Sequence, residues 1–320
     1  MYIMKPAALS CGRGIKVIGQ KTEIKKKPGY VVCQYISNPH LINGFKYDLR
    51  IYCLVTCYDP LKVYIFKEGL VRFATQKYTN SQKSVDQQYI HLTNYSVNKH
   101  NEDYVKNNAG SEDAENSSKW NLAQLKKYYQ EHQLDYELTM HRIRDVLIKT
   151  LISQEPHVIN SMSRFTKHKN VCFELYGFDI LVDNKLKPWL LEVNISPSLS
   201  SSSPLDKKIK TVLIADTLNL VGVFPYDRKQ YDKDIEAQLK KRLLGMGLKS
   251  EKEETQLELV QKDPNSYLSK LIKIMDKDVN NFDKLTDEDL TIILDFEEEQ
   301  FRLGNFEKIF PSINNVDYYN

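Results

Sequence analysis

Three side chains with oxygen donors, Asp179, Glu192 and Asn194, lie within the segment 173–199. Aspartate, glutamate and asparagine offer only oxygen ligands, and this set suits magnesium, which nucleotide sites usually share between one or two carboxylates and phosphate groups. Two carboxylates placed directly opposite each other in a sheet repel, so a positive ion is expected between them. A half-solvated hairpin with scattered acidic residues fits the same pattern, and the pattern alone does not separate the two interpretations.

A β-hairpin would bring these three side chains to one face. Apolar runs at 178–182 and 189–193 flank a polar turn at 183–185, which is the pattern of two paired strands. Pairing Asp183 with Pro188 would place Asp179 opposite Glu192, with Asn194 further along the same face. The other face is predicted to carry these side chains into a core: Phe178, Ile180, Val182, Leu191 and Val193.

A glycine-containing loop near the start could approach an anion. A short predicted strand at 1–4 leads to Lys5 and then to Gly12, Arg13 and Gly14. Glycine lets the backbone come close to an anion, and the two basic residues add positive charge. The pattern predicts a flexible loop over phosphates, although a tight turn between two strands fits a lone G-x-G equally well.

Charged residues also interrupt the predicted strands that follow. Lys46, Asp48 and Arg50 fall on one face of a predicted strand, either as the polar wall of a nucleotide cleft or as an exposed charge ladder. Arg72 lies among apolar neighbours and therefore needs an anionic partner, either a substrate carboxylate or a structural acid. We expect His91 to be a hydrogen-bonded structural residue.

The remaining chain divides by composition near residue 225. Helical spacing at 120–130, 140–152 and 206–221 predicts helices that pack on the sheet. The polar segment 101–119 is predicted to be a loop, and 155–170 an irregular connection. After residue 225, strongly charged segments predict an appendage of short helices.

Overall composition limits the classes of partner. The net charge of +3, from 45 basic and 42 acidic residues, is too close to balance to indicate nucleic acid or a membrane. Five cysteines, an odd number, favour free and mostly buried thiols in a reducing compartment. No apolar run approaches the roughly 20 residues of a membrane span, and the first residues do not resemble a signal peptide, so a cytosolic protein is expected.

Five ordered segments together carry a family resemblance. They are MKPAALSCGRGI, VVCQYISNPHLINGFKYDLRIY, DPLKVYIFKEGLVRFATQKY, HLTNYSVNKH and ELYGFDILVDNKLKPWLLEVNISPSLSSSSPLDKKIK. This series closely resembles the tubulin tyrosine ligase-like family, in particular its polyglutamylase branch, over most of residues 1–225. The ending FRLGNFEKIFPS is similar to the segment that follows the catalytic core in that branch.

The resemblance implies an α+β protein with the ATP-grasp fold. Residues 1–225 would form the ligase core, with its central and C-terminal lobes but without the N-terminal lobe that normally precedes the strand at Tyr2. Residues 226–320 would form a charged helical extension that contacts microtubules. Position 33 departs from the family, because it is Cys where Gln is common.

The resemblance also implies roles for individual residues. The catalytic residues would be Lys5, Arg72 and Glu192. ATP would be bound by Lys5, Arg13, Gly14, Ile15, Cys33, Gln34, Tyr35, Ile36, Lys46, Asp48, Thr93 and Asn94. Mg²⁺ would be bound by Asp179, Glu192 and Asn194. The incoming amino acid would be surrounded by Arg72, Tyr95, Ser96, Lys99 and Lys210, with Arg50 less firmly assigned.

The implied activity is that of a tubulin polyglutamylase. Such an enzyme uses ATP to join free L-glutamate to a glutamate side chain in a tubulin tail, through an acyl phosphate. Tubulin tails and microtubules would be its partners, in the cytoplasm, at the cytoskeleton, and at a cilium or basal body. A tubulin glycine ligase, or a truncated non-catalytic protein that binds microtubules, remains an alternative.

Overall fold

The computed structural model describes residues 1–9, 12–19, 28–107, 116–166, 172–223, 233, 240 and 298–312. The chain divides into two compact units, Met1–Thr217 with Asn305–Asn320, and Leu218–Gly304. Most of the charged segment after residue 225 lies outside the described residues, so the predicted appendage and its boundary stay predictions. All the site residues predicted from the sequence belong to the first unit.

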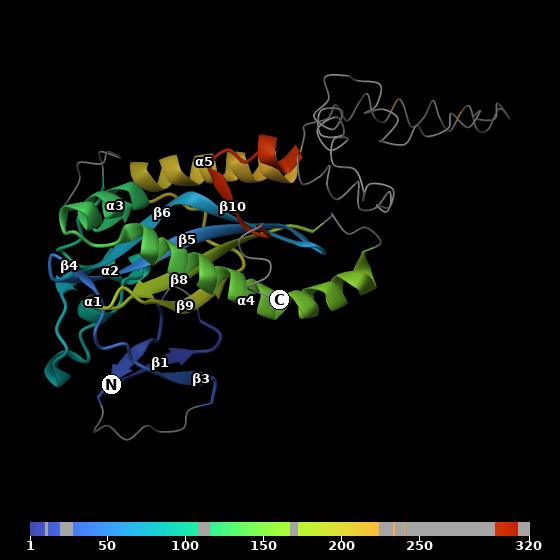
Figure 1. Ribbon diagram of the computed structural model, residues 1–320. Coiled ribbons are helices and arrows are strands. Elements are labelled where there is room, and N and C mark those ends of the chain that lie inside the picture. The colour runs from blue at the N-terminus through green and yellow to red at the C-terminus, as the bar shows by residue number, and fades with distance from the viewer. Residues whose placement is uncertain are drawn as a thin grey trace. The chain divides into compact units, whose positions relative to one another are not determined.

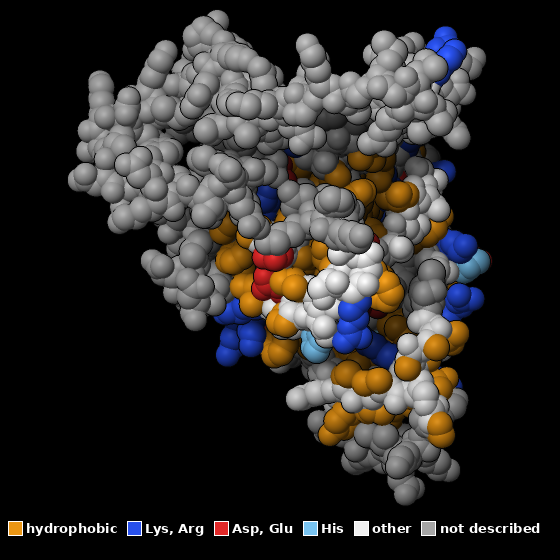
Figure 2. Space-filling view, turned by 90° about the vertical axis from the view of Figure 1, so that its right-hand side faces the viewer, with side chains coloured by type: hydrophobic (Ala, Val, Ile, Leu, Met, Phe, Trp, Pro, Cys, Tyr) orange, Lys and Arg blue, Asp and Glu red, His pale blue; other side chains and the backbone are white. Residues whose placement is uncertain are grey.

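A small antiparallel sheet carries the beginning of the chain. Its strands are β1 (Tyr2–Pro6), β2 (Lys16–Ile18) and β3 (Tyr30–Gln34), with β1 in the centre. Tyr2, Val31 and Val32 are exposed, and hydrophobic side chains gather at this end of the molecule in Figure 2. The β1–β2 connection contains the predicted phosphate loop.

A larger antiparallel sheet forms the body of the first unit. Within the described residues its strand order is β10-β6-β5-β8-β9, with β4 paired to β5 and β7 paired to β6. The strands are β4 (Leu41–Ile42), β5 (Phe45–Tyr58), β6 (Leu61–Lys77), β7 (Lys119–Asn121), β8 (Glu174–Val182), β9 (Pro188–Asn194) and β10 (Phe306–Phe310). The long central strands β5 and β6 are buried along most of their length, including the charged residues Lys46, Asp48 and Arg72.

Helices cover both faces of this sheet (Figure 1). Helices α3 (Leu122–Glu131) and α4 (Tyr136–Phe165) place Leu125, Ile143 and Leu147 in one core with β5, β6 and β8. Helix α5 (Pro204–Val221) runs along the opposite side. Three short helices, η1 (Gln82–Ser84), α1 (Gln88–His91) and α2 (Tyr95–Asn98), follow β6.

Helix α4 is longer than its sequence pattern indicates. The segment after residue 155 was expected to be irregular, yet the helix continues through Pro156 to Phe165. Proline removes one helical hydrogen bond, but Val158, Ile159 and Met162 pack against the core beyond it. Their packing stabilises the helix where local sequence disfavours it, so the prediction of an irregular connection was wrong as far as Phe165, and residues 167–170 lie outside the described residues.

The four described cysteines are free thiols; Cys53 and Cys57 are buried, and Cys33 is exposed.

Over the part of the chain that the structure describes, no helix combines the length and apolar character that a membrane span needs.

Candidate active site

One large pocket lies between the small sheet and the open edge of the main sheet. Its volume is about 740 Å³. Most of the residues predicted to bind ATP or metal line it, although they come from distant parts of the chain: Lys5, Ile15, Cys33, Gln34, Tyr35, Ile36, Lys46, Asp48, Thr93, Asn94, Asp179 and Glu192. Arg13, Gly14 and Asn194 do not line the pocket, though they are close to lining residues in sequence.

The β8–β9 hairpin places the predicted metal ligands together. Asp179 pairs directly with Glu192, as predicted, and Asn194 pairs with Gly177. The hairpin closes differently, because Pro188 pairs with Val182 and not with Asp183; a register shift between Asp179 and Ile180 restores the predicted pairing. The acidic pair therefore forms through a β-bulge that the sequence pattern did not indicate.

The opposite face of β9 is not fully buried. Phe178, Ile180 and Val182 of β8 lie in the core, as expected, but Val193 is 36% exposed and Leu191 is only partly buried. The prediction that Leu191 and Val193 enter the core was wrong. Strand β9 forms the edge of the sheet, so its outer side has no neighbouring strand within the described residues.

Four charged side chains form a ladder across β6, β5 and β8. Arg50 lies opposite Asp179, and Arg72 lies opposite Asp48. Arg50 donates to both oxygens of Asp179 at 2.6 and 3.2 Å, and Arg72 donates to Asp48 at 2.7 and 2.6 Å. Arg72 also contacts Asp179 at 2.8 Å. The anionic partners that Arg72 requires are thus structural acids, which was one of the two expectations.

Glu192 has the opposite electrostatic environment from Asp179. Burial alone would raise the pKa of Asp179, but the charges of Arg72 and Arg50 outweigh burial and hold this pKa well below its usual value. Burial raises the pKa of Glu192, and its contact with Asp179 raises it further. The ionised form is therefore favoured at Asp179, which contacts two guanidinium groups, and disfavoured at Glu192, which faces the charge of Asp179.

This donor set fits a divalent cation. The side chains of Asp179, Glu192 and Asn194 supply oxygen, and Asn194 is held by hydrogen bonds to the Gly177 carbonyl at 3.1 Å and to Glu192 at 3.4 Å. The described residues contain no group of three His, Cys, Asp or Glu side chains arranged for a metal. A cation here would thus need further ligands, such as the phosphate oxygens of a nucleotide in the adjoining pocket.

The end of the pocket that is predicted to bind the nucleotide has a buried lysine. The Lys46 ammonium donates to the Tyr35 hydroxyl at 3.1 Å and to the His91 carbonyl at 2.8 Å. The His91 ring bonds to the Tyr35 hydroxyl at 2.9 Å and to the Ser84 carbonyl at 3.0 Å, which is the structural role expected for it. Burial lowers the pKa of Lys46 to about 8.

The glycine loop lies against the same pocket. Gly12 has φ = +73°, and a Cβ atom there would lie 2.8 Å from the side-chain oxygen of Asn94. Only glycine combines this backbone conformation with so close an approach. The loop is therefore positioned over a residue that lines the predicted nucleotide site.

We expect nucleotide affinity to fall above pH 8, because Lys46 then loses its positive charge. The folded-state pKa of about 8 is below the usual value of 10.5, so the ammonium deprotonates first in the folded protein. The dissociation constant for ATP should rise by up to about tenfold per pH unit above this pKa. Titrating a fluorescent ATP analogue into the wild type and Lys46→Met at several pH values would measure this dissociation constant. Equal pH dependence in both proteins would contradict the prediction that Lys46 binds the nucleotide.

The residues predicted to surround the amino acid come from three elements. Arg72 lies on β6, Tyr95 and Ser96 lie on α2 with Lys99 at its end, and Lys210 lies on α5. Burial and the charges of Lys119, Arg50 and Arg72 lower the pKa of Lys210, against the opposing effect of Asp206. The described geometry thus brings Lys210 within electrostatic range of the charge ladder.

Lys119 and Asp206 are members of this region that the sequence did not single out. Their side chains form a buried ion pair at 2.9 Å. The Lys119 ammonium also lies 4.2 Å from the centre of the Tyr95 ring. Lys119 ends a polar segment without periodicity, so nothing in the local pattern marked it.

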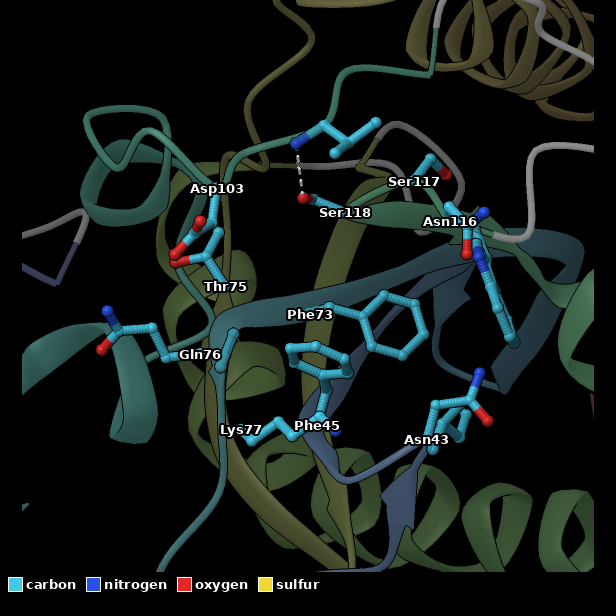
Figure 3. Close-up of a pocket in the computed structure, with 14 residues that line it drawn as sticks. Asn43, Phe45, Phe73, Thr75, Gln76, Lys77, Asp103, Asn116, Ser117 and Ser118 are labelled. Carbon is cyan, nitrogen blue, oxygen red and sulfur yellow. Dashed lines mark hydrogen bonds between the residues drawn. The ribbon is translucent and has the colours of Figure 1, made fainter.

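A second pocket, of about 480 Å³, lies elsewhere in the first unit. Figure 3 shows Phe45 and Phe73 beside it, with polar residues such as Thr75 and Ser118 around them. The Ser118 hydroxyl accepts a hydrogen bond from the Val105 amide at 3.0 Å. None of the residues predicted for catalysis or binding lines this pocket.

Comparison with known proteins identifies the family. The model of the tubulin-tyrosine ligase family matches residues 1–231. The chain belongs to the tubulin-tyrosine ligase family. The resemblance inferred from the five sequence segments is therefore confirmed, and the antiparallel α+β architecture agrees with the ATP-grasp-like fold expected for it.

Relatives of this tubulin-tyrosine ligase family member are glutamylases by name. The tubulin monoglutamylase TTLL4 of Mus musculus is 40% identical over 97% of this chain and 26% of its own length. The tubulin polyglutamylase TTLL5 of Mus musculus is 38% identical over 99% of this chain and 24% of its own length. The tubulin polyglutamylase ttll-4 of Caenorhabditis elegans is 38% identical over 99% of this chain and 50% of its own length. The chain thus spans about a quarter of the length of the first two relatives.

Proposed function

We propose that this chain forms the nucleotide-binding and amino-acid-binding part of an ATP-dependent tubulin glutamate ligase. The observation that carries the proposal is the Asp179–Glu192 pair on the wall of a pocket that also contains Lys5 and Lys46. A carboxylate pair facing basic residues is the arrangement that phosphoryl transfer from a metal-bound nucleotide requires. Membership in the tubulin-tyrosine ligase family and the names of the relatives support the same activity.

The proposed reaction activates a carboxylate with ATP. The γ-phosphoryl group passes to a side-chain carboxylate of a tubulin tail, which gives an acyl phosphate and ADP. The α-amine of free glutamate then attacks the acyl carbon, the amide bond forms, and phosphate leaves as the amine loses its proton. These reaction steps require no covalent intermediate between substrate and enzyme, which agrees with the absence of a predicted nucleophile and base.

The pocket residues would bind and orient the nucleotide. Cys33, Gln34, Tyr35 and Ile36 would border the adenine, where contacts through backbone amides tolerate Cys at position 33. Lys5, with the loop Arg13-Gly14-Ile15, would hold the phosphates. Asp179, Glu192 and Asn194 would hold Mg²⁺, which when bound would neutralise charge on the phosphates.

The charges around the amino-acid site favour glutamate. Lys119 and Lys210 lie near Arg50 and Arg72, and Asp48, Asp179 and Asp206 oppose three of these four positive charges. Free glutamate carries one more carboxylate than glycine, so this basic surrounding stabilises it more. We propose the same region for the α-carboxylate of the donor, with Arg72, Tyr95, Ser96, Lys99 and Lys210 around it.

Incorporation of labelled amino acids would test the activity. The full-length protein would be incubated with tubulin, ATP and labelled glutamate, glycine or tyrosine in separate reactions. We expect ATP-dependent incorporation of glutamate and little of the other two. Glycine incorporation would favour the glycine ligase, and microtubule binding without any incorporation would favour the non-catalytic alternative. The proposed place of action is the cytoplasm and cytoskeleton, including a cilium or basal body.

A further inference from the structure

The pocket of about 740 Å³ extends past the residues predicted to bind the nucleotide, as far as the turn between β8 and β9. Asn38, Asp183, Lys187 and Trp189 line this part of it. The sequence predicted no role in binding for any of these four residues. Trp189 is 38% exposed and presents a large aromatic side chain on the wall of the pocket. Aromatic walls with a few fixed polar groups are typical of ligand pockets, so this end has the character of a binding surface.

Two contacts hold the Trp189 ring in place. Its indole Nε1 donates to one carboxylate oxygen of Asp183 at 2.9 Å. The other oxygen of Asp183 accepts from the backbone amides of Lys185 and Lys187 at 2.9 and 3.0 Å, so the turn fixes this carboxylate. The Lys187 ammonium lies 4.0 Å from the centre of the Trp189 ring, within the range of a cation–π contact. The indole is therefore ordered without a ligand, which lowers the entropic cost of binding one.

The turn is also joined to the opposite wall of the pocket. The backbone amide of Asn184 donates to the Asn38 carbonyl at 3.0 Å. Asn38 comes shortly after residues 33–36, the segment predicted to border the adenine, and that segment lines the same pocket. The predicted adenine segment and the turn that holds Trp189 are thus attached to each other at this end of the pocket.

Strand geometry relates Trp189 to the acidic pair. Trp189 comes three residues before Glu192 on β9, and it pairs with Leu181 on β8. Leu181 lies two residues beyond Asp179 and therefore on the same face of the sheet. At about 3.3 Å per residue, Trp189 lies roughly 10 Å along the strand from Glu192. A nucleotide with its phosphates beside Asp179 and Glu192 would extend along these strands and bring its base towards Trp189.

We propose that Trp189 is a binding residue for the base of the nucleotide, held in place by Asp183 and Lys187. The proposal rests on the proposed function and deepens it, because it takes the phosphates to lie beside Asp179 and Glu192. Lys187 lies over one face of the indole, and the ring still lines the pocket. A planar base packs against an aromatic ring whatever its hydrogen-bond pattern, so this contact adds affinity for the base and none for the phosphates.

Binding of ATP and of inorganic tripolyphosphate to the full-length protein would test the proposal, measured by calorimetry with Mg²⁺. Tripolyphosphate carries the phosphate chain without a base. We expect Trp189→Leu to raise the dissociation constant for ATP about tenfold, within the range for a lost contact between a base and an aromatic ring. The dissociation constant for tripolyphosphate should change less than about twofold, because the phosphates do not touch the ring. Trp189→Phe should weaken ATP binding less, since it keeps an aromatic side chain.

Trp120→Phe is the matched control. Trp120 is 4% exposed, and it lines the second pocket and not this one. Both dissociation constants should be unchanged in this variant. Equal weakening of ATP and tripolyphosphate binding by Trp189→Leu, or no weakening of ATP binding, would overturn the proposal.

Tryptophan fluorescence provides a second readout. Saturating ATP should change the emission of the wild type and of Trp120→Phe, and this change should be lost in Trp189→Phe. A change of equal size in Trp189→Phe would also overturn the proposal. Neither measurement uses tubulin or glutamate, so the two proposals can fail separately. The expected binding pattern without glutamate incorporation would contradict the proposed reaction alone, whereas a wild type that binds no ATP would contradict both proposals.

Discussion

Glu192→Gln is expected to lower glutamate incorporation at least about 100-fold, the usual cost of removing a group that stabilises charge in a transition state. The substitution keeps the shape of the side chain and removes the negative charge that faces Asp179 across the hairpin. The proposed cation would then lose a ligand beside the phosphates. Incorporation assays and the Mg²⁺ dependence of ATP binding would measure the effect.

The fold should tolerate this substitution. The pKa of Glu192 is raised by burial and by Asp179, so its ionised form is disfavoured in the folded protein, and a neutral amide relieves that repulsion. Glu174→Gln is a matched control, because burial also raises the pKa of Glu174 on the same hairpin, away from the pocket. If Glu192→Gln kept activity while Glu174→Gln lost it, the assignment of the acidic pair would be wrong.

Asp179→Asn is expected to destabilise the chain by about 3–5 kcal/mol, the cost of breaking a buried ion pair from one side. The carboxylate contacts two guanidinium groups, Arg50 at 2.6 Å and Arg72 at 2.8 Å, and is 3% exposed. A neutral amide would remove the carboxylate charge that both arginines contact. Urea unfolding would measure the loss as a lower midpoint at unchanged slope.

The pH dependence of unfolding supplies an independent check. The pKa of Asp179 is lowered in the folded state by Arg72 and Arg50 acting against burial. Its contribution to the free energy of unfolding is therefore complete above the unfolded pKa of about 3.9 and is lost as the pH falls towards the lowered folded-state value. Asp179→Asn should lack this acid-sensitive component.

An exposed ion pair serves as the control for Asp179. Asp145 contacts Lys149 at 3.0 Å on α4, and both side chains are substantially exposed. Asp145→Asn should change the free energy of unfolding by less than about 1 kcal/mol. A comparable small loss for Asp179→Asn would mean that Arg50 and Arg72 find other partners or water, and that the charge ladder is not a main source of stability.

Alternation along the chain predicted the hairpin and its acidic face, but not the β-bulge through which Asp179 pairs with Glu192. Asp179 and Glu192 fall on the same face because strand side chains alternate, and the polar turn between the runs indicates where the strands reverse. The helix expected at 206–221 follows in the same way from apolar spacing, and α5 covers Pro204–Val221. These features depend on neighbours close in sequence, which is why local pattern predicted them.

Long-range pairing decided the rest of the site. Strand β10 joins β6 across more than two hundred residues of chain, and Arg72 receives its partners from β5 and β8. The β-bulge that aligns Asp179 with Glu192 and the path of α4 beyond Pro156 depend on packing against other elements. Local sequence patterns do not specify these contacts, because a strand with the same alternation could pair with several other strands.

The sequence by itself indicated the family, the types of residue in the pocket predicted to bind the nucleotide, and the side of the hairpin that carries its acids. Only the tertiary structure decided that Lys119 and Asp206 join α2 and α5 near Arg72. The physical reason is that strand and helix periodicities fix which face a side chain occupies, whereas its partners depend on how separate elements pack. Lys119 follows a polar segment without a periodic signal, so its contacts are visible only in the tertiary structure.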